Sequence, residues 1–188
     1  EAERLVRLRM QDGKPLMPPA DIMHLVEGGA IPEWKVDEAI HIWQATRREF
    51  KTSVNPASAE RLLFLTILLA QRFFAQGEQK RQRALFESAL NALSLPRHRQ
   101  MMRGSLTRAA ARQGDLAAAE AWLAPCDRQS DDLQMDSAYR YSRAYIDLLK
   151  GDWNAVGQGL GWNETDIPIL DAMESMCIVM RAHALEML

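Results

Sequence analysis

Three glycines, Gly77, Gly114 and Gly151, recur along the chain at an interval of 37 residues. Each of them follows a helix-like run and precedes an acidic residue. Glycine tolerates the left-handed backbone conformation that ends many helices, and an acidic side chain can cap the helix that begins next. A fixed period of roughly 20 to 50 residues is typical of stacked helical hairpins. The spacing therefore predicts an all-α chain of repeated hairpins.

Small side chains accompany these glycines at a fixed offset. Ala70, Thr107 and Ala144 each stand seven residues before a turn glycine, and the clearest repeat occupies residues 103–126. In this pattern the chain resembles the tetratricopeptide repeats, whose paired helices approach closely at small residues and turn at Gly-Asp or Gly-Asn. The period of 37 is longer than the ~34 of that family. The resemblance covers residues 57–162 and implies an α-α superhelix, a right-handed solenoid of hairpins.

The chain of 188 residues has the length of one compact domain with a substantial core. We expect residues 1–188 to form a single helical-repeat domain. Residues 1–54 are assigned to N-terminal helices, residues 57–162 to the hairpins and residues 166–188 to a terminal helix. Because the sequence opens at Glu1 without an initiator methionine and ends inside a helical pattern, it is expected to be a fragment of a longer protein.

Start and stop signals place the individual helices. Asn55 followed by Pro56 is typical of a helix start, because asparagine caps well and proline suits the first helical position. That helix is predicted to reach Gln76. The other predicted helices cover residues 21–27, 32–50, 79–93, 97–113, 115–124 and 152–156, and one capped by residues 130–132 runs to residue 150.

Motifs that would indicate catalysis lack the right context. The glycine-rich string at residues 157–161 closes a predicted helix, whereas a dinucleotide fingerprint follows a strand. The four histidines are scattered, and no spacing of histidine and cysteine is typical of a zinc site. We therefore expect a protein that is not an enzyme and that uses no metal and no cofactor.

Charge is divided unevenly along the chain. Residues 1–112 carry 18 basic and 12 acidic side chains, whereas residues 113–188 carry 5 basic and 13 acidic ones. Because a basic stretch can neutralise phosphates, an RNA- or anionic-surface-binding helical domain that uses residues 80–112 is the alternative function. The pI near 6.1 and the single aromatic residue of that stretch, Phe86, disfavour nucleic acid as the partner.

Tyrosine and arginine provide the candidate binding site. Tyr141 and Tyr145 are four residues apart and so share one face of their helix. The tetratricopeptide resemblance implies that this face lines a concave groove, with Arg108 and Arg112 on the equivalent face of the preceding hairpin. Both residue types are enriched at binding hot spots. We predict that these four bind a protein or peptide partner of acidic character, in a scaffold or assembly subunit; core packing of the tyrosines is the alternative.

Methionines mark the predicted terminal helix. Met173, Met176 and Met180 follow one stripe, and flexible methionine suits a surface that must repack against a partner. We predict self-association through these three residues, or else burial of the stripe by the chain's own helices.

Two further features bear on the compartment. The two cysteines, Cys126 and Cys177, are expected to be free thiols, which favours a reducing, cytoplasmic compartment. The longest apolar run, residues 62–70, is much shorter than the ~20 residues of a membrane span and is predicted to be a buried central helix. The sequence therefore predicts no transmembrane segment in this chain, although a membrane anchor outside this fragment stays open.

Overall fold

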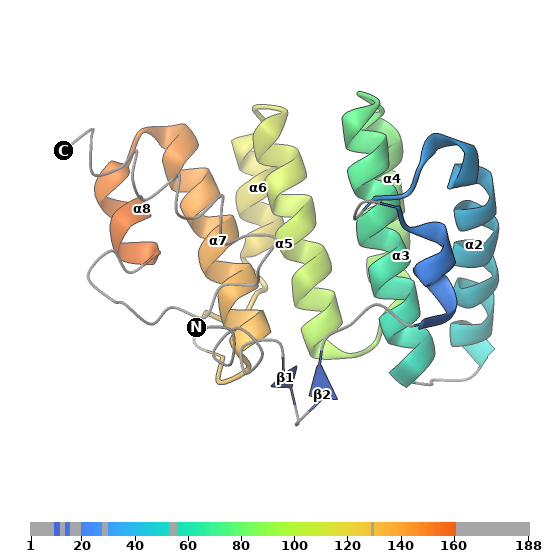
Figure 1. The fold of residues 1–188 in the computed structure, drawn as a ribbon. Coiled ribbons are helices and arrows are strands. Elements are labelled where there is room, and N and C mark those ends of the chain that lie inside the picture. The colour runs from blue at the N-terminus through green and yellow to red at the C-terminus, as the bar shows by residue number, and fades with distance from the viewer. Residues whose placement is uncertain are drawn as a thin grey trace. The chain divides into compact units, whose positions relative to one another are not determined.

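The computed structural model describes residues 10–11, 14–15, 20–27, 30–52, 56–128 and 130–160. Within these ranges the regular elements are helices and one short strand pair, as Figure 1 shows. The α-helices are α2 (Val36–Thr52), α3 (Pro56–Ala75), α4 (Gln79–Ala92), α5 (Pro96–Arg112), α6 (Leu116–Leu123), α7 (Leu133–Lys150) and α8 (Trp153–Gly159). The 3₁₀ helices are η1 (Ala20–Leu25) and η2 (Glu33–Lys35), and β1 (Met10–Gln11) pairs antiparallel with β2 (Lys14–Pro15). The all-α prediction is confirmed.

The chain divides into two compact units. One consists of Glu1–Leu16 together with Arg103–Leu188, and the other is Met17–Met102. We refer to them as the 103–188 unit and the 17–102 unit and describe each by itself.

In the 17–102 unit, α3 is the central helix. It packs against α2 and α4, and α2 also contacts α4 and η2. Leu62, Leu63, Leu65 and Leu69 of α3 are all fully buried, so the apolar run of residues 62–70 is a buried central helix as predicted. Within the described ranges, no helix has both the length and the hydropathy that crossing a membrane requires.

In the 103–188 unit, α7 contacts both α6 and α8. One core cluster is formed by the buried residues Ala110, Ala111, Ala119, Leu123, Cys126 and Ile146, and a second by Ala144, Val156 and Leu160. Three of the residues of the first cluster are alanines, and a methyl side chain lets neighbouring helices approach closely. Of the small residues that the sequence pattern singled out, Ala144 lies in the second cluster, and Ala70 and Thr107 are buried.

The three turn glycines adopt one backbone geometry. Their φ angles are 74° at Gly77, 79° at Gly114 and 74° at Gly151. In each turn the glycine N–H donates to the carbonyl three residues earlier, and the next N–H donates to the carbonyl five residues earlier. This pair of bonds is the Schellman motif, which satisfies carbonyls at a helix C-terminus. The turn prediction is confirmed at all three positions.

Capping by the acidic residue that follows each glycine is confirmed twice and wrong once. The Asp115 carboxylate accepts the Ala118 N–H at 2.9 Å, and the Asp152 carboxylate accepts the Ala155 N–H at 3.0 Å. Glu78 makes no such bond. Aspartate is a preferred N-cap residue, whereas glutamate is not, because its longer side chain carries the carboxylate past the first-turn N–H groups.

Other boundaries differ from the prediction in detail. Residues 21–27 were expected to form a helix, but the segment is the 3₁₀ helix η1, followed by an isolated bridge between Glu27 and Ala30. The helix expected over residues 152–156 continues to Gly159 in α8, because its buried residues Val156 and Gly157 extend the packed face. Asn55, the expected terminal helix and the methionine stripe of Met173, Met176 and Met180 lie outside the described residues.

Candidate functional site

The candidate site lies where α5 and α7 meet in the 103–188 unit. The guanidinium carbon of Arg108 on α5 stands 4.9 Å from the centroid of the Tyr141 ring on α7. The Tyr141 and Tyr145 rings are in edge-to-face contact, with centroids 6.5 Å apart and planes at 72°. A cation near the face of an aromatic ring is attracted by the ring's quadrupole. Arg108, Tyr141 and Tyr145 thus form one continuous chain of contacts.

Two serine hydroxyls fix the direction of the Arg108 side chain. Its Nη1 donates to Ser142 Oγ at 2.7 Å, and its Nη2 donates to Ser105 Oγ at 3.2 Å. Ser142 is fully buried, and its hydroxyl is within donor distance of the Ala138 carbonyl at 2.6 Å. Because the guanidinium is held by hydrogen bonds and by the ring, its charge occupies a defined position at this surface.

A glycine makes this contact between α5 and α7 possible. A Cβ atom on Gly104 would lie 2.8 Å from Ser142 Oγ and 3.3 Å from the Ala138 carbonyl oxygen. Ser142 Oγ is also within 3.2 Å of the Gly104 carbonyl oxygen. The two helices therefore approach too closely at Gly104 for any other residue to fit without displacement.

Tyr141 and Tyr145 are half-buried. The sequence left open whether they pack in the core or lie at a binding surface, and the rings do both in part. Tyr141 and Tyr145 both pack against the cluster of Ala144, Val156 and Leu160. Tyr145 also packs against the cluster that contains Ile146. Each ring therefore supports the core while part of it stays at the surface.

Arg112 lies one helical turn beyond Arg108. It is exposed, and its Nε donates to the Arg108 carbonyl at 3.3 Å. Of the four predicted residues, three are joined by ring and cation contacts, and Arg112 is attached to them through the α5 backbone. Ser105 and Ser142 were not predicted from the sequence. Their only signal was position: Ser105 stands three residues before Arg108 on the same helix face.

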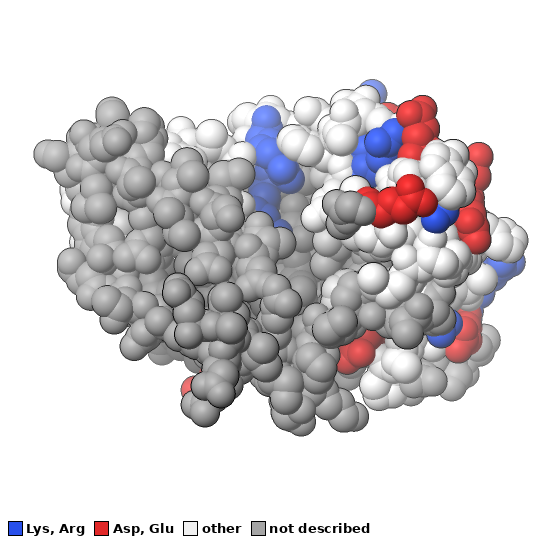
Figure 2. Space-filling view, viewed as in Figure 1, with Lys and Arg blue, Asp and Glu red and all other residues white. Residues whose placement is uncertain are grey.

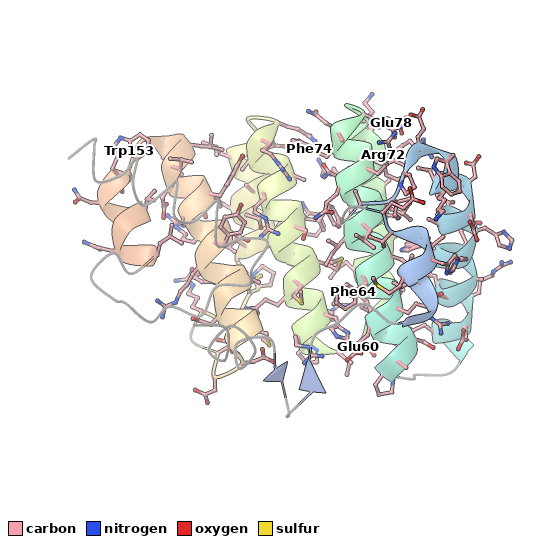
Figure 3. The ribbon with its side chains drawn as sticks, in the orientation of Figure 1. Glu60, Phe64, Arg72, Phe74, Glu78 and Trp153 are labelled. Carbon is pink, nitrogen blue, oxygen red and sulfur yellow. The ribbon has the colours of Figure 1, made fainter. Side chains whose placement is uncertain are left out.

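Much of the basic stretch of residues 80–112 is paired within the protein. Arg81 binds Glu78 at 2.6 Å, Arg83 binds Glu87 at 2.9 Å, and Arg97 approaches Glu60 at 3.8 Å. Figure 3 labels Glu60 on α3 and Glu78 at the turn between α3 and α4, so both acids come from outside the stretch. Arg99 donates to the carbonyls of Leu90 and Leu93 at 2.8 and 2.9 Å. These cations neutralise acids and carbonyls of the protein itself.

Opposite charges also alternate elsewhere on the 17–102 unit. Lys35 binds Glu27 at 3.0 Å, and Arg72 binds Glu33 at 3.0 Å. Figure 2 shows acidic and basic side chains side by side over the η1, η2 and α2 region. In this region, basic side chains therefore lie beside acidic ones of the same unit.

Glu120 on α6 joins two cations of α7. It binds Arg143 at 3.2 Å and also Lys150, and Arg143 in turn binds the buried Asp147 at 2.7 Å. The Lys150 hydrogen bond, more than the nearby positive charges, lowers the pKa of Glu120 below its ordinary value. The hydrogen bond with Asp147 raises the pKa of Arg143. This network fastens α6 to α7.

The chemistry of Cys126 is that of a core residue. Burial raises the pKa of its thiol to about 11, so the reactive thiolate is scarce at neutral pH. Among the residues that the structure describes, no three His, Cys, Asp or Glu side chains are grouped so that they could hold a metal ion.

Comparison of the chain with models of protein families, with curated proteins and with solved structures gives no match. What can be inferred about function therefore depends on the residues and their geometry.

Proposed function

We propose that the chain is a non-enzymatic protein-interaction module, a scaffold or assembly subunit built from tetratricopeptide-like hairpins in a right-handed superhelix. Three helix pairs, α3–α4, α5–α6 and α7–α8, share one turn geometry at Gly77, Gly114 and Gly151, which supports a repeat. The tetratricopeptide assignment adds the expectation that the first helices of successive pairs line the binding surface. Arg108 on α5 and Tyr141 on α7 belong to such first helices.

The observation that carries the proposal is the fixed guanidinium of Arg108 against Tyr141. Side-chain order that exists before binding does not have to be created by the partner, so less entropy is lost on association. Arginine and tyrosine are also the side chains that most often dominate binding energy. A positive charge beside two aromatic rings suits a peptide that presents a carboxylate next to an apolar side chain. The partner is therefore an acidic peptide segment.

The RNA-binding alternative is less well supported. Arg81, Arg83 and Arg97 already have acidic partners within the chain, and each would have to exchange that partner for a phosphate. Salt separates the two functions, because affinity for nucleic acid falls steeply with ionic strength.

A random peptide library selected against the full chain tests the proposal. We expect acidic peptides to be enriched, and their affinity to fall about tenfold or more in Arg108→Ala and in Tyr141→Ala. Arg48→Ala is the matched control, because Arg48 is exposed on α2 and belongs to the other unit. Circular dichroism checks that each variant is folded. Peptides that bind all three variants with the affinity of the wild type would contradict the proposal, as would a selection without acidic sequences.

A further inference from the structure

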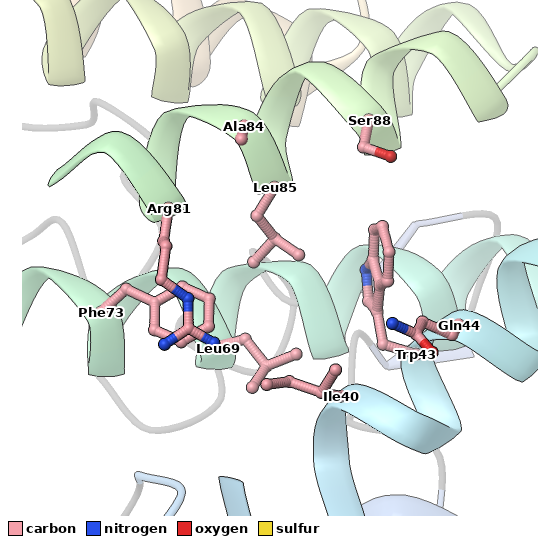
Figure 4. Close-up of a pocket in the computed structure, with 9 residues that line it drawn as sticks. All are labelled: Ile40, Trp43, Gln44, Leu69, Phe73, Arg81, Ala84, Leu85 and Ser88. Carbon is pink, nitrogen blue, oxygen red and sulfur yellow. The ribbon is translucent and has the colours of Figure 1, made fainter. Parts of the chain in front are cut away.

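Trp34 of η2 is the most exposed large apolar side chain among the residues that the structure describes. It is 71% exposed, and the next, Leu149, is 46% exposed. The other tryptophan of the 17–102 unit, Trp43, is buried and lines the groove between α2 and α4 that Figure 4 shows. Because burial of an indole is strongly favourable, a tryptophan that served the core would be covered in the same way. Trp34 is therefore available to a partner.

A lysine already uses one face of the Trp34 ring. The Lys35 Nζ lies 4.4 Å from the ring centroid, so the ring holds a cation by its quadrupole. The same ammonium group donates to the His24 carbonyl and binds the Glu27 carboxylate at 3.0 Å. These contacts join η1 to η2 beside the indole. The rest of the exposed ring stays at the surface.

Acidic side chains share this part of the unit with Trp34. Glu33 precedes it directly, and Glu27 is joined to it through Lys35. Because η2 runs directly into α2, Asp37 and Glu38 follow Trp34 at the spacing of three and four residues that places side chains on one helix face. All four acidic residues are exposed.

The ion pairs of this region have the cation inside and the carboxylate outside. In the pair of Lys35 with Glu27 the side chains are 13% and 55% exposed, and in the pair of Arg72 with Glu33 they are 24% and 81% exposed. A carboxylate has about four lone-pair positions, so one that binds an inner cation can still bind another from outside. The charge that a partner meets is therefore negative, and Figure 2 shows the acidic side chains at the surface over η1, η2 and α2.

Arginine is the side chain that complements both parts of this surface. Its planar guanidinium stacks on aromatic rings, of which tryptophan binds cations best, and it pairs with carboxylates through two parallel hydrogen bonds. Tryptophan is also among the residues that most often dominate the energy of protein interfaces. The outward carboxylates repel the phosphates of nucleic acids and of anionic lipids, so the charge favours a protein partner.

We propose that the Trp34 surface, formed by Trp34, Glu27, Glu33, Asp37 and Glu38, binds a basic protein segment that places an arginine on the Trp34 ring. The carboxylates pair with the cations of that segment. This surface belongs to the 17–102 unit and takes a partner of the opposite charge to the one proposed for Arg108 and Tyr141. It therefore does not rest on that proposed function.

Two fluorescein-labelled peptides of alternating charged residue and glycine test this. One contains arginine, and the other contains citrulline, which keeps the shape of arginine without its charge. Fluorescence anisotropy measures their binding to the full chain, and we expect the arginine peptide to bind at least about tenfold more tightly. Trp34→Ala and Trp34→Leu should each weaken that binding about tenfold, because leucine is apolar but has no ring face for a cation. Glu33→Gln combined with Asp37→Asn should weaken it about fivefold.

Matched controls come from the 103–188 unit. Leu149→Ala removes another exposed apolar side chain, and Asp127→Asn with Asp131→Asn removes two other exposed carboxylates. Both controls should bind the arginine peptide as the wild type does. Circular dichroism checks that each variant is folded.

Three outcomes would overturn the proposal. The first is equal binding of the arginine and citrulline peptides. The second is binding that both Trp34 variants leave unchanged, because the peptide would then be attracted by the acidic charge alone. The third is a dimer in sedimentation that Trp34→Ala dissociates, since the occupant would then be a second copy of the chain.

Discussion

The indole nitrogen of Trp43 on α2 donates a hydrogen bond of 2.7 Å to the hydroxyl of Thr66 on α3. The Thr66 hydroxyl in turn donates a hydrogen bond to the Leu62 carbonyl at 2.6 Å, and the Trp43 and Thr66 side chains are both buried. A tryptophan can therefore lie between these helices without leaving its one polar atom unsatisfied. This bond also fixes the orientation of the Trp43 ring.

Thr66→Val should destabilise the protein by about 1–3 kcal/mol, because it keeps the volume but leaves the buried Trp43 N–H without an acceptor. Urea unfolding followed by circular dichroism measures the change. In the Trp43→Phe background, where there is no N–H to satisfy, the same substitution should cost clearly less. Equal costs in the two backgrounds would contradict the role given to this bond.

Gly114→Ala should cost about 1–2 kcal/mol, because alanine is strained at the φ of 79° that this turn requires. Gly159→Ala is the control. Gly159 is the last residue of α8, its φ is not positive, and an added Cβ there meets no atom within 4 Å. That control should be neutral or slightly stabilising. Thermal unfolding of the two variants distinguishes backbone strain from a general intolerance of alanine.

Gly104→Ala should destabilise the 103–188 unit by about 1–3 kcal/mol, since its new methyl group would overlap Ser142 Oγ. Adding Ser142→Ala should recover part of the loss, because the atom at 2.8 Å is then gone. The contact with the Ala138 carbonyl remains, so recovery should be incomplete. Urea unfolding of the single and double variants provides the comparison. A double variant less stable than Gly104→Ala would show that the overlap is not the cause.

Glu120 should make stability depend on pH in the acid range. Its folded-state pKa lies below the ordinary value of 4.5, so between these two values the unfolded chain binds more protons. Its contribution is therefore complete above about pH 4.5 and is lost as pH falls through the folded pKa. Because Glu120 and Lys150 are both well exposed, we expect their ion pair to contribute less than ~1 kcal/mol to the free energy of unfolding. The difference in unfolding free energy between wild type and Glu120→Gln should shrink toward pH 3; a difference independent of pH would contradict this.

Cys126 should resist thiol reagents in the folded protein, because burial raises its pKa to about 11. In a Cys177→Ser variant, Cys126 is the only cysteine of the chain. Its reaction with a chromogenic disulfide at pH 8 should be at least about tenfold slower in buffer than in 8 M urea, as expected from its small thiolate fraction and restricted access. Equal rates would show that the thiol is accessible and ionised in the native state.

Local chemistry explains what could be predicted of the fold from the sequence. Gly114 ends a helix, Asp115 caps the next and Pro56 opens another. Each does so through interactions within a few residues, so these helix boundaries can be predicted from the local sequence. Glu78 does not cap the helix that follows it, because its side chain is longer than that of aspartate and pairs with Arg81. The strand pair that ends at Pro15 and the 3₁₀ form of Ala20–Leu25 had no periodic signal.

The candidate site was predictable only in part. Helical spacing put Tyr141 and Tyr145 on one face, and the repeat register placed Arg108 on the preceding hairpin. The extent to which the tyrosine rings are buried and the hydrogen bond between Arg108 and Ser142 both depend on how closely α5 and α7 approach. That distance is determined by Gly104, whose role appears only when the atoms opposite it are known. The groove between α2 and α4 was not predicted, because it combines residues from three helices.

A Cβ added at Gly77, Gly114 or Gly151 would meet no atom within 4 Å. Each turn therefore has room for a side chain and rejects one only through stereochemistry. A mirror-image amino acid favours the backbone angles that its natural counterpart avoids. A chain prepared by chemical ligation with D-alanine in place of Gly114 would keep the turn and have fewer unfolded conformations to lose, which makes it more stable than the natural chain. What recurs every 37 residues is thus a requirement of chirality, met by the one genetically encoded residue that has none.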